Sequence, residues 1–388
     1  MALFELDNLT GFPAQNIFSL DALDAAYHTV VAKISYDMTI DPQSGHCALT
    51  FAAKQQPLAF ADEHYGDPQH TSVRQGCDTV PYKPYLDVII NATAYAPQDK
   101  PCKQFGVVMQ IGERKKALAV RGPTFWQKEP LGWSLTDPTP ITSLPLKYEY
   151  AHGGTQQWAD DHHIYPANPI GVGWYAKPYL SRFNQKNLLP AAQIFALERP
   201  INDLSQDIGT EGFGVYGRSW LERYPLAGTA DAVWQEERHP LMPQDFSMHY
   251  WNDAHPDLQF THPKPNHVYT IRLTNMVAAK AVPSQIIELQ LPVETVFVYL
   301  KTEDNIGLCQ DLTLDTIHID VDSRRLSCTY RVTLAHELNI DECQLRHIAR
   351  AERGAQIAAA KALGQEPAAT AFIPIPPSLS LLNECKDC

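Results

Sequence analysis

The middle of this 388-residue chain limits its fold most, because residues 121–270 hold 16 of the 30 prolines, 11 of the 20 glycines and all seven tryptophans. Proline breaks helices and cannot donate to the hydrogen-bond ladder of a central strand. We therefore expect little regular secondary structure here, and a long coil that large side chains pin in place. The tryptophans, at positions 126, 133, 158, 174, 220, 234 and 251, are the candidates for that task.

Strand-like segments rich in β-branched and aromatic residues flank the coil on both sides. Before it they are residues 27–38, 47–53, 86–95 and a hairpin over 105–120, and after it residues 268–273, 286–291, 296–300, 313–321 and 326–334. A proline and a glycine in the sequence DPQSG, residues 41–45, favour a turn between the first two segments. The pattern predicts a mainly β protein with two packed antiparallel regions, sandwich- or barrel-like, over residues 1–120 and 271–334.

A single helix is expected over residues 335–364, followed by an extended tail over 365–388. Asn339 with Glu342 three residues later fits a capping box, and Glu342 and Arg346 would lie one helical turn apart. The tail contains four prolines, at 367, 374, 376 and 377, and shows neither a helix nor a strand period.

The formal net charge of −13 argues against a nucleic-acid partner, since such proteins concentrate lysine and arginine. No apolar run approaches the roughly 20 residues that span a bilayer, and the first basic residue is Lys33, unlike the start of a secretory signal. We expect a cytoplasmic protein without membrane insertion. The eight cysteines are scattered along the chain, which favours reduced thiols.

Several motifs with catalytic associations lack their structural context. Gly212, Gly214 and Gly217 match a dinucleotide-binding fingerprint, but no strand precedes them and Pro225 interrupts the next segment, so we expect turns and close packing. Cys385 and Cys388 form a CxxC without further ligands, and their role is left open. No GxSxG elbow and no phosphate-binding loop is present.

Residues 152–163 carry side chains of the types that bind zinc or iron, namely His152, Asp160, Asp161, His162 and His163. They leave a metal-dependent hydrolase centred on His152, Asp161 and His163 as the alternative function. Adjacent histidines do not readily point at one ion, and the chain has no HExxH. A loop with surface histidines is the competing interpretation, so we expect no bound metal.

Two features favour recognition of another protein. Aromatic side chains dominate interface hot spots, and the coil presents the candidates Trp126, Trp133, Trp158, Trp174, Trp220 and Trp251. On the expected helix, Arg346, Arg350 and Arg353 share one face and could dock an acidic partner. Packing of the coil against itself and a solvated helix face are the competing interpretations.

The order of segments resembles domain-of-unknown-function family 2169 over nearly the whole chain. The segments are VVAKISYDM (30–38), CDTVPYKPYLDVIINATAYAP (77–97), YEYAHGG (148–154), NPIGVGW (168–174), GFGVYGRSWLER (212–223), DFSMHYWNDAHPDLQ (245–259) and LDTIHIDVDSRRLSCTYR (314–331). The motif positions are Pro81, Lys83, Asp87, Tyr148, Glu149, Gly153, Gly154, Asn168, Pro169, Gly171, Gly214, Asn252 and Asp257. His152 stands where the family more often has an aromatic residue, and Tyr330 where it often has tryptophan.

This resemblance implies an adaptor or chaperone that accompanies type VI secretion effectors. Such a protein is expected to bind an effector and assist its loading onto the spike, which consists of a trimeric needle-tip protein and its cap. The expected partners are thus an effector and a spike or cap protein. No enzymatic activity is attached to the family, and we expect no cofactor.

Overall fold

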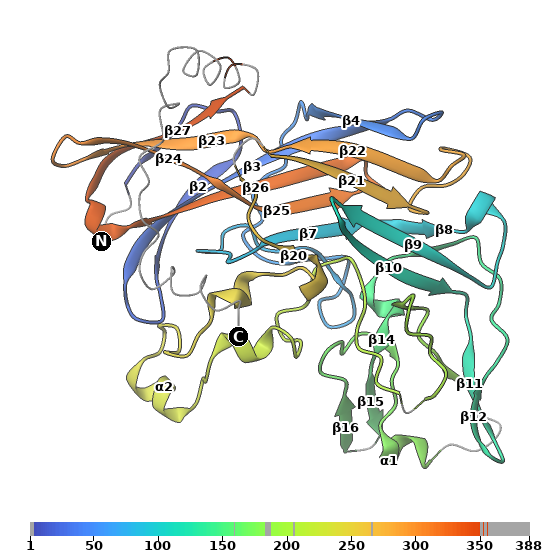
Figure 1. Ribbon diagram of the computed structural model, residues 1–388. Coiled ribbons are helices and arrows are strands. Elements are labelled where there is room, and N and C mark those ends of the chain that lie inside the picture. Colours follow the sequence, from blue (N-terminus) through green and yellow to red (C-terminus); the bar gives the residue numbers. More distant parts are fainter. Residues whose placement is uncertain are drawn as a thin grey trace.

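The computed structural model describes residues 4–158, 160–182, 188–204, 206–264, 267–349, 352 and 355. Within them the protein is mainly β and is built around one large sheet curled into a half-barrel (Figure 1). The predicted fold class is therefore confirmed in its main feature.

Twelve strands form the large sheet. In order across it they are β19 (Ile194–Ala196), β10 (Arg114–Arg121), β9 (Gln104–Ile111), β21 (Val268–Thr274), β22 (Ile286–Pro292), β4 (His46–Phe51), β3 (Ala26–Ile40), β26 (Arg325–Ala335), β25 (Thr313–Asp320), β7 (Leu86–Asn91) and β20 (Gln259–Phe260), with β2 (Ala14–Leu20) paired to β3.

The two predicted β regions are interleaved in this sheet and are not two packed units. Strand β3 pairs with β26 from Tyr27↔Ala335 to Asp37↔Arg325, and β7 pairs with β25. The sheet is also mixed, because β7 runs parallel to β25 and β4 runs parallel to β22. The prediction of separate regions at 1–120 and 271–334 is therefore corrected, because pairing between distant strands leaves no mark in a single segment. Strand pairs within each region are antiparallel, as predicted, and the parallel pairs β7–β25 and β4–β22 join one region to the other.

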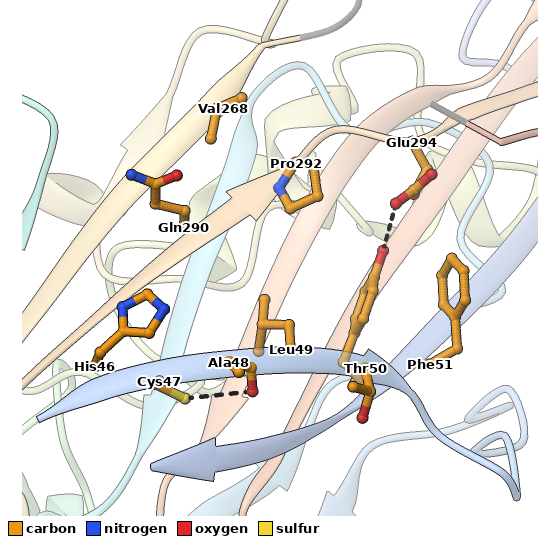
Figure 2. A pocket seen from close by; sticks show the side chains of 11 residues that line it. His46, Cys47, Ala48, Leu49, Thr50, Phe51, Val268, Gln290, Pro292 and Glu294 are labelled. Carbon is orange, nitrogen blue, oxygen red and sulfur yellow. Dashed lines mark hydrogen bonds between the residues drawn. The ribbon is translucent and has the colours of Figure 1, made fainter. Parts of the chain in front are cut away.

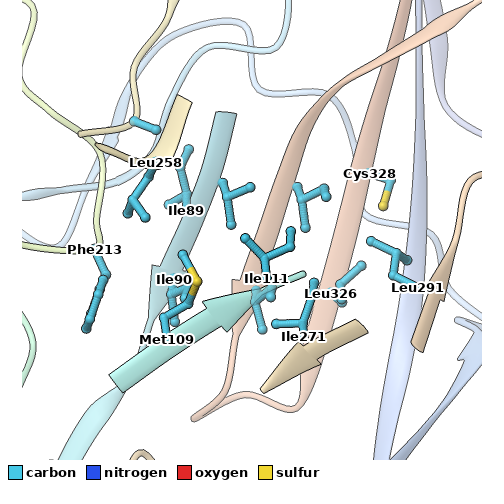
Figure 3. Close-up of a cluster of buried hydrophobic side chains, with 14 of the residues drawn as sticks. Ile89, Ile90, Met109, Ile111, Phe213, Leu258, Ile271, Leu291, Leu326 and Cys328 are labelled. Carbon is cyan, nitrogen blue, oxygen red and sulfur yellow. The ribbon is translucent and has the colours of Figure 1, made fainter. Parts of the chain in front are cut away.

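The 15-residue strand β3 shows how the sheet is stabilised from both sides. Its even-numbered residues, such as Val30 and Ile34, belong to the main hydrophobic core, whereas Thr29, Lys33 and Ser35 are buried on the opposite face. The core draws on early and late strands together, as Figure 3 shows for Ile89, Ile90, Met109, Ile111, Phe213, Leu258, Ile271, Leu291, Leu326 and Cys328. Strands covered on both faces become long apolar runs, which makes them recognisable in a sequence.

A second sheet of four strands extends from the large one and includes residues 340–348 of the expected helix. Its order is β1 (Leu6–Asn8), β27 (Ile340–Ile348), β23 (Thr295–Thr302) and β24 (Gly307–Asp311). The helix prediction is wrong over residues 340–348. The burial of Cys343 and Leu345 has the period of a strand, and Asn339 adopts a left-handed turn with φ of 46° instead of capping a helix.

The coil over residues 121–270 contains only short elements, as its prolines and glycines predict. Its strands are β11 (Phe125–Glu129), β12 (Gly132–Leu135), β13 (Ser143–Pro145), β14 (His152–Gly153), β15 (Thr155–Trp158), β16 (Asp161–Ile164), β17 (Val172–Gly173) and β18 (Leu188–Pro190), besides β19, β20 and the start of β21. Its helices are α1 (Lys177–Leu180) and α2 (Ala232–Glu237), with 3₁₀ turns at Tyr148–Tyr150, Tyr224–Ala227, Met248–Trp251 and Pro256–Leu258.

Outside the coil, β8 (Thr93–Tyr95) pairs with β13, β5 (Glu63–His64) pairs with β6 (Val73–Gln75), and 3₁₀ turns lie at Pro97–Asp99 and His336–Leu338. Six cysteines among the described residues carry free thiols. No helix in the described part of the chain is both long and apolar enough to span a membrane.

Candidate functional site

Buried charges gather on the face of the sheet opposite the main core, where loops from both halves of the chain cover β3, β26, β25 and β7. We call this set the polar layer. It consists of Lys33, Asp78, Lys83, Asp87, Asp253, Asp315 and Arg331, so that three cations meet four carboxylates.

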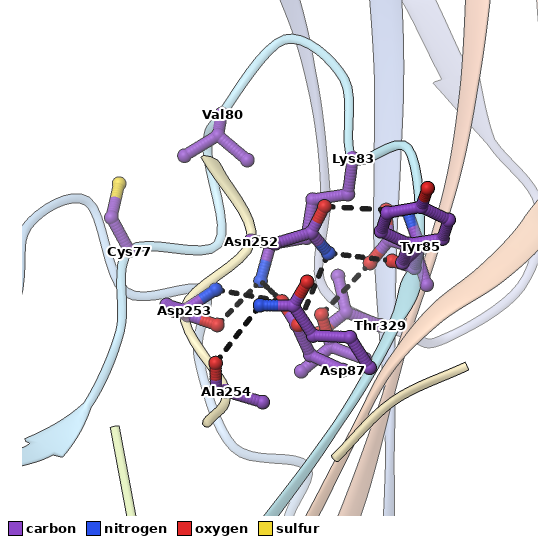
Figure 4. A network of polar contacts seen from close by, with 12 residues as sticks. Cys77, Val80, Lys83, Tyr85, Asp87, Asn252, Asp253, Ala254 and Thr329 are labelled. Atoms are coloured by element: carbon purple, nitrogen blue, oxygen red, sulfur yellow. Dashed lines mark hydrogen bonds and ion pairs between the residues drawn. The ribbon is translucent and has the colours of Figure 1, made fainter. Parts of the chain in front are cut away.

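Lys83 is the centre of the first part of the polar layer (Figure 4). Its Nζ lies 2.8 Å from Asp87 Oδ2 and 2.8 Å from Asp253 Oδ1, and the three side chains are 3%, 0% and 6% exposed. Asp87 stands near the start of β7, and Asp253 comes shortly after the 3₁₀ turn that ends at Trp251. The pair of contacts therefore ties the end of the coil to the sheet.

Asn252 strengthens this tie through hydrogen bonds to the backbone and to Asp87. Its Nδ2 donates to Tyr85 O at 2.8 Å and to Asp87 Oδ1 at 3.0 Å, and Asp253 N donates to Asp87 Oδ2 at 3.0 Å. The Asp87 carboxylate thus accepts bonds at both oxygens, which is what a buried carboxylate requires.

Two carboxylates that share one ammonium respond differently to burial. Burial raises the pKa of Asp87 to about 7, with Asp253 adding to the shift and Lys83 opposing it. Burial also disfavours the charged form of Asp253, but Lys83 and Arg223 outweigh it and lower the pKa of Asp253 to about 2. For Lys83, burial works against the charge, yet Asp253 and Asp87 together raise its pKa above the ordinary value. Lys83 therefore stays charged, and its stronger partner is Asp253.

The second part of the polar layer holds the loop before β7 against β3 and β26. Lys33 Nζ donates to Asp78 Oδ2 at 2.8 Å, and Thr329 Oγ1 donates to Asp78 Oδ1 at 3.0 Å. Arg331 Nε donates to Asp315 Oδ2 at 2.6 Å, Nη2 donates to Asp78 O at 2.9 Å, and Nη1 bonds Val80 O. Each cation has its own carboxylate.

The hollow between these groups measures only about 10 Å³. That is room for about one water molecule, so no substrate fits beside the charges. The polar layer therefore attaches loops to the sheet and leaves little free space between its charges.

The remaining motif positions form a second junction within the coil. Asn168 Nδ2 donates to Tyr148 O at 2.9 Å and to His152 O at 3.1 Å, and Tyr148 Oη donates to Gly214 O at 3.2 Å. A Cβ added at Gly153 or Gly171 would come within 2.2 or 2.3 Å of Asn168 atoms, which explains both glycines. Glu149 accepts from Ser72 N at 3.1 Å, which joins the junction to the residue before β6.

Two prolines of the motifs act through their carbonyl oxygens. Pro81 O accepts from Thr29 Oγ1 at 2.9 Å and from Thr333 Oγ1 at 3.0 Å, and Pro169 O accepts from Thr155 Oγ1 at 2.8 Å. Gly154 has φ of 136°, which a residue with a side chain rarely adopts.

Asp257 belongs to a partly exposed cluster with Lys116, Glu211 and His255. Glu211, His255 and Asp257 are the group of ligand-type side chains among the described residues that could hold a metal ion. Lys116 Nζ already lies among them, 2.5 Å from Glu211 Oε2, 2.8 Å from Asp257 Oδ2 and 3.4 Å from His255 Nδ1. The ammonium supplies the positive charge that a metal would bring.

The residues proposed for a metal-dependent hydrolase do not form such a group in the described part of the chain. His152 is 4% exposed on β14, and burial lowers its pKa to about 4, with Asp207 acting in the opposite direction. His163 lies on β16 opposite Gln156, and Asp161 pairs with Arg182 at 2.8 Å. His152, His163 and Asp161 therefore have separate contacts and do not form one metal site.

Five of the six tryptophans proposed for partner binding contact the chain itself. Trp126 and Trp220 are buried, at 1% and 6% exposure, so neither can touch a partner on the surface. Trp133, Trp174 and Trp251 are half-buried, and the side chain of Trp158 lies outside the described residues. Trp220 packs edge-on against Tyr148 with ring centroids 5.0 Å apart. The competing interpretation, self-packing of the coil, is correct for Trp126 and Trp220.

Arg346 does not lie on the predicted helix. Arg346 lies on β27, where its guanidinium stacks on the Tyr299 ring at 5.5 Å, and its expected partner Glu342 pairs instead with Lys301 at 2.9 Å. Arg350 and Arg353 lie outside the described residues, as do Cys385 and Cys388.

Two of the three glycines of the apparent dinucleotide fingerprint, Gly212 and Gly217, serve close packing, as expected. A Cβ at Gly212 would lie 2.4 Å from Tyr148 Cε1, and one at Gly217 would lie 2.4 Å from Trp220 Nε1. The sequence reasoning missed Lys33, Asp78, Asp253, Asp315 and Arg331. The available signal was a lone charge inside an apolar strand, as in VVAKISYDM, since such a charge is buried only with a partner.

A bacterial family described as "Uncharacterized protein conserved in bacteria (DUF2169)" matches residues 24–331. The chain belongs to this family. No curated protein and no solved structure matches it. The DUF2169 match contains the whole polar layer and ends at Arg331, so that β1 and β27 of the four-stranded sheet lie outside it.

Proposed function

We propose that this protein is a cytoplasmic adaptor or chaperone that binds a type VI secretion effector and assists its loading onto the spike, through contacts with the effector and with the needle-tip trimer or its cap. The proposal rests on the resemblance of seven segments to effector-associated proteins of the DUF2169 family.

The observation that supports the adaptor proposal is that the polar layer leaves almost no free space between its side chains. Lys83, Asp87, Asn252 and Asp253 are motif residues or their neighbours, and all four are buried and bonded to one another around a hollow of about 10 Å³. These residues fix loops onto a sheet. Their arrangement therefore favours a structural scaffold whose outer surface contacts another protein. A holding protein needs such a surface and needs no reaction chamber.

A tagged protein purified from its native host tests the proposal. We expect an effector together with a spike or cap protein to copurify. Deletion of the gene should abolish secretion of that effector, while a second effector of the same host is still secreted. Copurification of neither partner, or unchanged secretion of every effector in the deletion strain, would contradict an adaptor role.

Metal analysis of the purified protein examines the hydrolase alternative. Since Lys116 occupies the one suitable group among the described residues, we expect no stoichiometric zinc or iron. Stoichiometric metal that is lost in the His163→Ala variant would favour the hydrolase over a purely noncatalytic adaptor.

A further inference from the structure

The large sheet is split between β4 and β22. These parallel strands are in register only at Glu288↔His46 and Leu289↔Cys47, and beyond that point they separate. A hollow of about 560 Å³ lies in the gap, lined by Tyr36, His46, Cys47, Ala48, Leu49, Thr50, Phe51, Val268, Gln290, Pro292 and Glu294. Figure 2 shows the β4 side chains on one side of it and Val268, Gln290 and Pro292 on the other.

Backbone groups of β4 face this gap without a strand to pair with. In an antiparallel pair, every second residue directs its N–H and C=O toward the partner. Ala52 N donates to Ser35 O and Asp41 N donates to His46 O, so even-numbered residues of β4 bond to β3. Leu49 and Phe51 therefore direct their N–H and C=O groups into the gap.

Strand β22, on the other side of the gap, also has backbone groups that face the gap. Asn275 N donates to Gln285 O and Val293 N donates to His267 O, so odd-numbered residues of β22 bond to β21. Glu288 points the other way, and its N–H reaches Gly45 O at 3.0 Å. By the same alternation Gln290 and Pro292 face the gap, which is thus bordered by two strand edges.

The side chains along the gap indicate what would fill it. Leu49, Val268 and Pro292 are half-buried, and Phe51 is 49% exposed and stacks on Tyr36 at a centroid distance of 5.3 Å. The lining contains neither lysine nor arginine and one carboxylate, that of Glu294. Glu294 Oε1 accepts from Tyr36 Oη at 3.4 Å, and Oε2 lies 3.1 Å from His347 Nε2 at the edge of the gap. An apolar segment with a basic side chain is complementary to this lining in polarity and charge.

We propose that the gap between β4 and β22 receives an extended strand of the client effector, which adds to the sheet by main-chain hydrogen bonds and places a basic side chain near Glu294. This inference rests on the proposed adaptor function and specifies the binding surface. Strand addition takes its affinity from the backbone and its selectivity from alternate side chains, which suits a protein that must hold an incompletely assembled client.

Hydrogen exchange of the purified protein with and without the copurified effector locates the contact. We expect the amides of Leu49, Phe51 and Gln290, whose N–H groups face the gap, to gain protection when the effector is bound. Protection confined to other parts of the chain, such as β24 or the coil, would overturn the inference while leaving the adaptor function standing. Failure to capture any effector would overturn both.

A proline substitution tests the same edge by affinity. Leu49→Pro removes an N–H that faces the gap without removing a bond to β3, and we expect the effector to bind about tenfold more weakly or worse. Cys309→Pro is the matched control, because Cys309 lies on β24, the edge strand of the four-stranded sheet. Thr302 N donates to Ile306 O, so even-numbered residues of β24 bond to β23, and the N–H of Cys309 faces away from β23. Circular dichroism of both variants checks folding.

Equal effector affinity for folded Leu49→Pro and Cys309→Pro would overturn the inference. Should Leu49→Pro not fold, the exchange experiment decides alone. A second variant, Glu294→Gln, should weaken the binding of an effector whose contacting segment is basic, with Cys309→Pro as the unaffected reference. Equal binding by Glu294→Gln and the unaltered protein would remove the charge component of the proposal.

Discussion

At the scale of single residues, His152 shows how one buried side chain can make the stability of the fold depend on pH. Its Nε2 is buried without a hydrogen-bond partner, and its ring meets the Tyr165 ring edge-on with centroids 5.1 Å apart. The His152 ring packs like an aromatic side chain but can bind a proton. Protonation in acid therefore lowers the stability of the folded state, because the charged ring would be buried.

Replacing His152 by phenylalanine should make the protein less sensitive to acid. The pKa of His152 is about 4 in the folded protein and 6.5 in the reference state, so the unfolded chain binds more protons between these values. Stability is therefore lost as pH falls from 6.5 to 4, by up to about 3 kcal/mol from this group. Urea unfolding at pH 7.5, 5.5 and 4.5 should show a flatter acid limb for His152→Phe. Equal slopes in both proteins would contradict this assignment.

Lys83 should be the most costly single charge to remove from the polar layer. Lys83→Met leaves Asp87 and Asp253 buried without their ammonium, and breaking a buried pair typically costs about 3–5 kcal/mol. The control is Lys103→Met, whose partner Asp137 is 73% exposed, with Lys103 itself 54% exposed, so that its loss should cost about 0–1 kcal/mol. Denaturant unfolding measures both. Similar losses for the two variants would show that the polar layer does not stabilise the fold.

At the scale of elements, local sequence predicts strands better than it predicts their partners. The runs around Val30, Ile89 and Leu326 are apolar enough to identify strands buried on both faces. Nothing within these runs tells that β3 lies beside β26, nearly 300 positions later, because pairing depends on the whole chain. The polar layer is only half visible in the sequence for the same reason: Lys33 stands out as a lone charge in an apolar run, but its partner Asp78 can be identified only once the loop lies on the strand.

In strand β27 a local sequence rule predicts a helix, and the structure has a strand instead. Asn339 and Glu342 fit a capping box, yet the apolar positions Cys343 and Leu345 alternate and are buried against neighbouring strands. Tertiary pairing with β23 and β1 overrides a helix signal that is worth little by itself.

Substitutions along β27 should show the strand period. Leu345→Ala removes a fully buried side chain and should cost about 2–5 kcal/mol. Arg346→Ala removes an exposed guanidinium that stacks on Tyr299 and should cost about 0.5–1 kcal/mol. Thermal or denaturant unfolding gives both values. A cost at Arg346 as large as that at Leu345 would argue against the strand and for a helix over these residues.

At the scale of the whole molecule, the interleaved sheet and the pinned coil share one hydrophobic core. The core joins Val30 and Ile90 from the first part of the chain with Phe213 from the coil and Leu326 from the last part. Lys83 and Asn252 then fasten the coil to β7 from the other face. For the proposed holding function, a frame that keeps its shape would limit the entropy lost when a client binds.

Cooperativity can be measured because two spectroscopic probes report different parts of the chain. All seven tryptophans lie in residues 121–270, so their fluorescence reports the coil, whereas far-ultraviolet circular dichroism reports mainly the strands. We expect coincident transitions in denaturant, which is the mark of two-state unfolding. Lys83→Met should shift both midpoints together, since it loosens the junction between coil and sheet. If the fluorescence instead changes at a lower denaturant concentration than the dichroism, the coil unfolds before the sheet and is a separate unit. The gap between β4 and β22 would then lie in a sheet that is stable without the coil.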